Sequence, residues 1–351
     1  MRCARLPRVG AWLGKPSRLC GAVCIASASL ACLGCGATHH SRSTPRPAAP
    51  SSAPATASAP APGSTTASEP RQSPATRARL IAVLPAASRS GLFGWAPAVA
   101  VRGQTAVWIS RVPAYRDGAF TVTLLRIDQR LVTLALHAGG SQPGGSGWRY
   151  GDMIAGAERR VVVMGFNGAF QEGYGAGGFA EGGRVGWRLQ RGKASVVIYR
   201  DGSSDIGRWQ VTVPAAGRPV EAVRQNLRLL IDGGRIAPTV DACIKVCWGD
   251  PLHEQPVVAR SGLGITPGGD LIWAAGHNLS VRALAEALAG KGVTRAMELD
   301  INPAWVAGYV YRHPRHARLP VAVPLVPGQT GVAGQFLTPY FRDFFTVDTR
   351  R

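Results

Sequence analysis

Two carboxylates with a spacing suited to chemistry, Glu298 and Asp300, lie in the segment TRAMELD. Side chains alternate between the two faces of a strand, so this spacing predicts both carboxylates on one face, with Met297 and Leu299 on the other. Paired carboxyl groups at a strand end suit general acid and base catalysis on a glycosidic bond. The structural alternative is that one carboxylate caps a turn while the other pairs with an arginine.

Two further polar residues follow apolar or glycine-rich backbone. Arg260, in VVARSGLGITPGG, is predicted to clamp a phosphate, because a planar guanidinium matches two phosphate oxygens. Asn167 ends the apolar run of VVVMGFNGAF and is predicted to present a neutral polar group to a ligand. The structural alternatives are that Arg260 is a surface arginine and that Asn167 is a turn residue in the left-handed region. The glycine-rich GYGAGGFAEGG that follows Asn167 is expected to form a loop over the site.

Other candidate residues favour structural interpretations. His313 and His316 lie in YRHPRHARLP, where proline and arginine indicate an exposed loop rather than a metal site. Ser261 lacks the motif of a serine-hydrolase nucleophile. Asp232, in the turn IDGGR, is interpreted as structural. No metal and no cofactor are expected.

Two cysteines remain outside the N-terminal segment, Cys243 and Cys247 in DACIKVCWGD. In an oxidising compartment, two lone cysteines this close predict a local disulfide. So short a loop stabilises by about 2 kcal/mol in the chain-entropy model. A metal site that includes His253 is the alternative, although a fourth ligand at normal spacing is missing.

Residues 1–36 are predicted to be an export signal. Five basic residues lead into an uncharged run over residues 20–36, which is short for a membrane-spanning helix. Gly34 before Cys35 predicts lipid attachment at Cys35, with Cys32 as the alternative site. An uncleaved membrane anchor and simple secretion are the other readings. All three readings place the rest of the chain outside the cytoplasm. Lipid attachment and an uncleaved anchor would also hold it to a membrane by its N-terminus.

Residues 37–78 consist mainly of Ala, Pro, Ser and Thr and show no apolar period. They are predicted to form a disordered linker that acts as a spacer from the membrane. A single folded domain is predicted over residues 79–351.

The domain has the sequence pattern of an α+β fold with mixed β-sheets, many short strands and few helices. Short runs rich in Val, Ile, Leu, Thr and aromatic residues alternate with glycine-rich turns. One helix is predicted to begin after Ser280 and to end at Gly290. It separates strands over 271–275 and 293–300, which predicts a crossover unit over 271–300 with those strands as parallel neighbours. Asp300 is then at the carboxyl end of a strand, where ligands of such units gather.

The formal net charge of +20 has several interpretations. Nucleic-acid binding is disfavoured, because the sequence contains no block of Lys and Arg and no interleaving of basic and aromatic residues. An anionic substrate or surface fits the charge equally well.

These segments together resemble the phosphodiester glycosidase family, which includes the uncovering enzyme that removes N-acetylglucosamine from a phosphodiester on mannose. MGFNGAF resembles the Asn-Gly-Gly-Phe segment of the family. GKASVVIYRDGSSDIGRW, RQNLRLLIDGGRI, ARSGLGITPGGDLIW and LSVRALAEALAGKGVTRAMELD then follow in the order of the family. The resemblance covers residues 159–345. ELDINP with a closing RDFF resembles an actinobacterial-type branch, in which Ile301-Asn302-Pro303 replaces the usual run of glycines and serine.

The resemblance implies cleavage between the anomeric carbon of a sugar and a phosphate. Asp300 is then expected to stabilise the oxocarbenium-like centre or to activate water, with Glu298 tuning it. Arg260 is expected to hold the phosphate. The residues expected to contact the sugar are Asn167, Asn302 and Trp305.

The predicted function is therefore an extracytoplasmic hydrolase that acts on sugar-phosphodiester units of an envelope polymer or exopolysaccharide. The alternative is a non-catalytic lipoprotein on the same fold that binds a glycan or an anionic polymer, since Pro303 removes a backbone amide from the loop in which the family has glycines.

Overall fold

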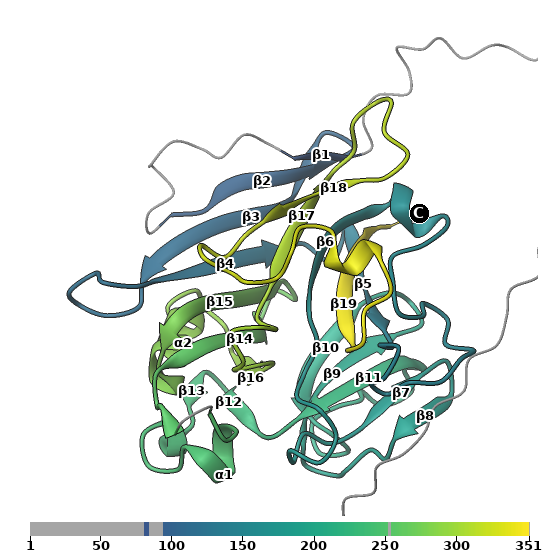
Figure 1. Ribbon diagram of the computed structural model, residues 1–351. Coiled ribbons are helices and arrows are strands. Elements are labelled where there is room, and N and C mark those ends of the chain that lie inside the picture. Colours follow the sequence, from purple (N-terminus) through teal and green to yellow (C-terminus); the bar gives the residue numbers. More distant parts are fainter. Residues whose placement is uncertain (1–80, 84–93, 252–253, 351) are drawn as a thin grey trace, which may run out of the picture. The chain divides into compact units, whose positions relative to one another are not determined.

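The structure is a computed structural model that describes residues 81–83, 94–251 and 254–350 (Figure 1). All of these residues belong to one compact unit within Glu69–Arg351. The predicted signal over residues 1–36, with Cys32 and Cys35, lies outside the described residues. So do the linker over residues 37–78 and the alternative metal ligand His253.

Three antiparallel sheets make up this unit. The first has nine strands in the order β1-β2-β3-β4-β15-β14-β16-β12-β13. Their bounds are Ile81–Val83, Ala96–Val101, Gln104–Pro113, Thr121–Ile127, Leu271–Leu279, Val258–Ile265, Arg295–Glu298, Leu229–Asp232 and Arg235–Ile236. The second sheet has the order β10-β9-β11-β7-β8, with bounds Ser204–Arg208, Ala194–Tyr199, Val220–Asn226, Phe179–Glu181 and Arg184–Trp187. The third has the order β18-β17-β6-β19-β5, with bounds Val321–Pro324, Gly308–Arg312, Val162–Asn167, Phe344–Thr349 and Val132–His137.

Helices are few, as the sequence predicts. The described residues contain α1 (Lys245–Trp248), α2 (Val281–Ala289) and short 3-10 turns at Glu158–Arg160, Pro238–Val240 and Gln335–Leu337. The fold class, with many short strands and few helices, is confirmed. The sheets are antiparallel between all named strands rather than mixed. No helix in the described ranges has the length and apolar character needed to cross a membrane.

The predicted crossover unit is present as β15-α2-β16. Ser280 caps α2, because its hydroxyl accepts a hydrogen bond from the backbone N–H of Ala283 at 3.1 Å. Val281, Leu284 and Leu288 are buried on the face that packs against the first sheet. The apolar period of the sequence therefore defines the packed face of this helix.

One detail of the predicted unit is wrong, because β15 and β16 run parallel but are not neighbours. β14 lies between them and pairs antiparallel with both, Gly262 opposing Ala274 on one side and Glu298 on the other. The turn TPGGD joins β14 to β15 in a hairpin. This hairpin partner occupies the edge of β15 that the crossover strand would otherwise take.

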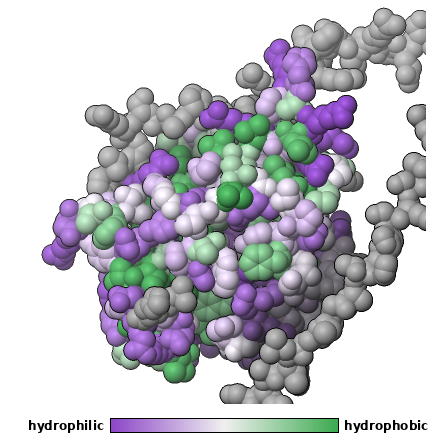
Figure 2. Space-filling view, viewed as in Figure 1, coloured by the Kyte–Doolittle hydropathy of each residue, from purple (hydrophilic) through white to green (hydrophobic). Residues whose placement is uncertain are grey.

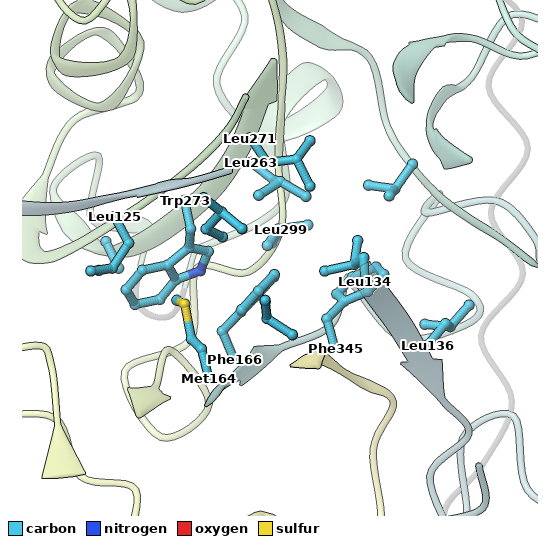
Figure 3. Packing of buried hydrophobic residues seen from close by; sticks show 14 of the residues in the cluster. Leu125, Leu134, Leu136, Met164, Phe166, Leu263, Leu271, Trp273, Leu299 and Phe345 are labelled. Carbon is cyan, nitrogen blue, oxygen red and sulfur yellow. The ribbon is translucent and has the colours of Figure 1, made fainter. Parts of the chain in front are cut away.

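The main core is built from side chains of all three sheets. Trp273 of β15 is fully buried, with its ring centroid 5.7 Å from that of Phe166 on β6. Figure 3 shows its indole beside Met164 and Phe166, with Leu263 and Leu299 nearby. On the outer face seen in Figure 2, hydrophobic side chains are scattered among hydrophilic ones.

The predicted disulfide is confirmed. Cys243 and Cys247 are bonded, with their Cα atoms 5.5 Å apart. Cys247 lies in α1, whose Trp248 is buried and donates a hydrogen bond to the carbonyl of Thr239 at 3.0 Å. The disulfide thus closes a short loop against a buried tryptophan.

We predict that Gly308→Ala destabilises the fold. A Cβ at this position would lie 2.4 Å from the indole of Trp273, in the contact between β17 and β15. Forcing a methyl group into so tight a contact costs about 1–3 kcal/mol. Urea unfolding should show the lower midpoint.

Gly268→Ala is the matched control, because the nearest atom to its added Cβ is 3.9 Å away, in an exposed turn. We expect its free energy of unfolding to stay within about 0.5 kcal/mol of wild type. Equal stability of the two variants would contradict the close packing of the two sheets at Gly308.

Candidate functional site

A pocket of about 160 Å³ lies where β16, β6 and β19 approach one another. Its walls come from the segments that follow β6, α1 and β16 and from the segment that precedes β19. The residues that line it are Phe170, Gln171, Tyr174, Gly249, Asp250, Asp300, Ile301, Asn302, Trp305 and Arg342.

Asp300 is a buried carboxylate at this pocket, with one oxygen hydrogen-bonded to backbone and the other in an ion pair. Oδ1 accepts from the backbone N–H of Ile301 at 2.7 Å and of Asn302 at 2.8 Å. Oδ2 lies 2.9 Å from a guanidinium nitrogen of Arg342. Burial raises the pKa of Asp300, whereas Arg342 and the two amides oppose this shift.

Arg342 is the basic residue of the pocket and is only 3% exposed. Its Nη2 donates to the carbonyl of Ala169 at 2.8 Å, and its guanidinium carbon lies 3.8 Å from the ring centroid of Trp305. Its Nη1 is buried and has no hydrogen-bond partner within the described part of the chain. Arg342 thus brings a guanidinium to the wall of the pocket, where it is paired with Asp300.

The next residue, Asp343, forms a second buried ion pair. Its Oδ2 lies 2.8 Å from Nε of Arg224 on β11, and its Oδ1 lies 3.1 Å from Nη2 of the same residue. The backbone N–H of Ala169 also donates to Asp343. A Cβ on Gly168 would lie 1.9 Å from the Asp343 carboxylate, so a glycine is required at this close approach.

Glu298 and Asp300 do not share a face, contrary to the sequence prediction. Just beyond β16, Leu299 donates its N–H to the carbonyl of Ser261, and Ser261 donates its N–H to the carbonyl of Asp300. Two residues therefore oppose one, which is the pattern of a β-bulge. Because a bulge breaks the alternation of side chains, Asp300 turns towards Arg342 while Glu298 stays on the α2 face of the sheet.

Arg260 does not line the pocket, so the prediction that it clamps a phosphate there is wrong. It is fully buried, and its Nη1 lies 2.6 Å from Oε1 of Glu298. Its Nε and Nη2 donate to the carbonyls of Leu279 and Pro256, at 2.9 and 3.2 Å. Arg260 and Glu298 thus form a structural ion pair, as the alternative reading of the carboxylate pair anticipated for Glu298.

Asn167 is also absent from the pocket lining, and a contact with substrate is not supported. Its Nδ2 donates to Oγ of Ser261 at 2.9 Å, and that oxygen in turn accepts from the backbone N–H of Asp300 at 3.2 Å. Asn167 is 3% exposed. It therefore supports the backbone of Asp300 rather than presenting its amide to a ligand.

Three of the predicted site residues do come together at the pocket: Asp300, Asn302 and Trp305. The glycine-rich segment GYGAGGFAEGG borders the pocket through the 65% exposed Tyr174, whereas its second half forms β7. Sequence reasoning missed Arg342. The only signal was its place in the RDFF segment, which was noted without a role.

The remaining candidates lie elsewhere. His313 is half-buried and bonds to the carbonyl of Val162 at 2.7 Å, whereas His316 is exposed. Asp232 is 45% exposed and lies 3.3 Å from Arg208. Across the described ranges, no three His, Cys, Asp or Glu side chains cluster in a way that could hold a metal ion.

Fold and site together define an antiparallel β protein with a carboxylate and an arginine in a small pocket. The sequence matches no protein-family model and no curated protein. Among solved structures, the chain is similar to the catalytic domain of zebrafish N-acetylglucosamine-1-phosphodiester alpha-N-acetylglucosaminidase, auto-inhibited by its pro-peptide. The identity is 14%, the TM-score is 0.44, and the match covers 70% of this chain and 82% of that one.

Two bacterial structures are also similar to the chain. A hypothetical protein from Synechocystis has 12% identity and a TM-score of 0.38, over 71% of this chain and 63% of that one. A Burkholderia pseudomallei protein that is thought to be exported has 11% identity and a TM-score of 0.35, over 65% and 74%. At these values the similarities assign no activity to this chain.

We predict that the stability contributed by Glu298 depends on pH. Burial raises the pKa of Glu298 to about 7, and Arg260 opposes the shift. Between the unfolded and folded pKa values the native state holds a proton that the unfolded state has lost, so the free energy of unfolding falls as pH rises from about 4.5 to 7. Glu298→Gln should flatten this decline in urea titrations, because the amide does not titrate.

Glu172→Gln, a substitution at an exposed carboxylate, is the control and should keep the wild-type slope. A Glu298→Gln protein whose stability declines with pH as wild type does would show that Glu298 stays ionised beside Arg260 throughout this range.

Proposed function

We propose that the chain is a hydrolase that cleaves the bond between the anomeric carbon of a sugar and a phosphate. The observation that carries this proposal is that Asp300 and Arg342 line one pocket as an ion pair, and that Nη1 of Arg342 has no hydrogen-bond partner among the residues the structure describes. The reaction needs a group that stabilises positive charge at carbon and a group that stabilises negative charge on phosphate. This pair supplies one of each.

Arg342 acts on the leaving group. When the glycosidic C–O bond breaks, its electron pair stays on the phosphate oxygen, and the diester monoanion becomes a monoester dianion. A guanidinium at the non-bridging oxygens interacts more strongly with the developing dianion than with the monoanionic diester of the ground state. It therefore lowers the barrier to bond cleavage. Trp305 stacks on the guanidinium and Ala169 accepts from it, so that its orientation is set before substrate binds.

Asp300 acts on the sugar. Its carboxylate stabilises the positive charge that develops at the anomeric carbon, or takes a proton from the water that attacks there. Water supplies the hydroxyl of the released sugar, and its proton leaves through Asp300. Asn302 lines the same pocket and is the residue placed to bond with sugar hydroxyls.

The proposed substrate is a sugar-phosphodiester unit of an envelope polymer or exopolysaccharide. The predicted export signal and linker would carry the domain outside the cytoplasm, tethered to a membrane by its N-terminus. The excess of basic over acidic residues suits such an anionic polymer.

One observation favours a second candidate, a non-catalytic protein that binds the same kind of polymer. Both oxygens of Asp300 already have partners, Oδ1 with two backbone amides and Oδ2 with Arg342. A carboxylate so fully bonded can serve as a fixed part of a binding pocket. The two functions differ in turnover, which can be measured directly.

We predict that Asp300→Asn abolishes release of sugar from synthetic sugar-1-phosphodiesters. Loss of the charge should lower kcat by about 10²–10⁴-fold, which is the range for positioned acid and base groups. Asp232→Asn is the matched control, because Asp232 lies at the exposed end of β12 outside the pocket and its replacement should leave the rate unchanged. Steady-state assays with a panel of sugars provide the measurement.

Arg342→Lys should also lower the rate, since an ammonium cannot replace a planar guanidinium at a phosphate. Turnover by wild type that Asp300→Asn leaves intact would end the catalytic assignment. Saturable binding of the phosphodiesters without turnover would identify the second candidate function instead.

A further inference from the structure

A second and larger groove, of about 890 Å³, shares no lining residue with the pocket of Asp300. Five segments far apart in sequence form it: Thr133 of β5, the loop at residues 149–150, the turn at 155–161, the β9–β10 turn at 200–202, and residues 348–350 at the end of β19. The last four contribute one arginine each, namely Arg149, Arg160, Arg200 and Arg350. Folding thus gathers cations that the sequence keeps apart.

Carboxylates neutralise this groove incompletely. Arg149 and Arg200 share Glu221. Nη1 of Arg149 lies 2.7 Å from Oε1 of Glu221, and Nε of Arg200 lies 3.8 Å from Oε2. Arg350 donates to neutral carbonyls, including those of Gln129 at 2.6 Å and Asp201 at 3.0 Å. The lining holds four arginines against three acidic residues, Glu158, Asp201 and Asp348, and the exposed Arg160 is an arginine of this set that has no ion pair within the described ranges.

A buried carboxyl group, Asp348, lies in the lining of the groove. It is 7% exposed, and its Oδ1 has no hydrogen-bond partner among the residues described. Glu158 lies nearby and is bonded to His137 at 2.7 Å and to Thr346 at 2.9 Å. Burial and the charge of Glu158 raise the pKa of Asp348 well above its usual range. This shift favours a neutral acid, which does not repel an anion in the groove.

We propose that this groove is a binding site for the phosphate or carboxylate groups of an acidic glycan, held by Arg160 and Arg200 with Asp348 at its floor. Guanidinium groups suit such oxyanions because they donate two parallel hydrogen bonds. Tyr150 lines the same groove and offers an aromatic surface for a sugar ring. A polymer would bind here independently of any chemistry at Asp300.

The test measures the affinity of the full chain for an oligomeric poly(glycerol phosphate) by calorimetry at fixed salt. Neutral dextran is the uncharged probe. The variant Arg160→Ala with Arg200→Ala removes two exposed cations of the groove. We expect it to weaken binding about tenfold, which two charge-assisted hydrogen bonds readily account for. The matched control is Arg191→Ala with Arg235→Ala, which removes two exposed arginines outside the groove.

The control variant should bind within about twofold of wild type, because it changes the net charge equally but leaves the groove intact. Equal weakening by both double variants would overturn the proposal, since the attraction would then be a general effect of charge. Absence of binding to wild type, or equal binding of dextran, would overturn it too. None of these outcomes depends on turnover at Asp300, so failure here and failure of the proposed hydrolase are distinguishable.

Discussion

Two adjacent residues of opposite charge, Arg342 and Asp343, hold the centre of this structure together. Arg342 pairs with Asp300 beyond β16, and Asp343 pairs with Arg224 on β11. All four side chains are almost entirely buried. Removing one partner of a buried ion pair leaves an uncompensated charge and costs about 3–5 kcal/mol. The segment before β19 therefore links the first, second and third sheets by interactions that cannot be broken singly without large cost.

The first sheet uses its two faces for different ion pairs. On the α2 face, Arg260 forms a buried ion pair with Glu298. Nε and Nη2 of Arg260 donate to backbone carbonyls. On the opposite face, the bulge opposite Ser261 turns Asp300 towards Arg342, whose Nη1 has no hydrogen-bond partner in the described part of the chain. Similar chemical groups thus give a structural pair in one place and a candidate active site in the other. The difference lies in which pair opens onto a pocket.

The grouping of basic residues into clusters also depends on folding. The sequence has an excess of arginine without any block of it, which speaks against nucleic acid. In the folded unit, four of these arginines line one groove, and a fifth lies at the candidate active site. Net charge alone does not reveal such clusters, because they arise between segments that are joined only by tertiary contacts.

The sequence alone determined the features that depend on a few neighbouring residues: the short strands, the cap of α2 at Ser280, the disulfide of Cys243 with Cys247, and the position of Asp300 just past a strand. Only the tertiary structure decided which guanidinium meets Asp300, and it is Arg342 rather than Arg260. Strand periodicity is a local property, whereas the bulge that reverses Asp300 depends on its register against Ser261 of another strand. The insertion of β14 between β15 and β16 likewise follows from a hairpin pairing that no local pattern encodes. Local propensities act over a few residues, but a site forms where distant segments meet.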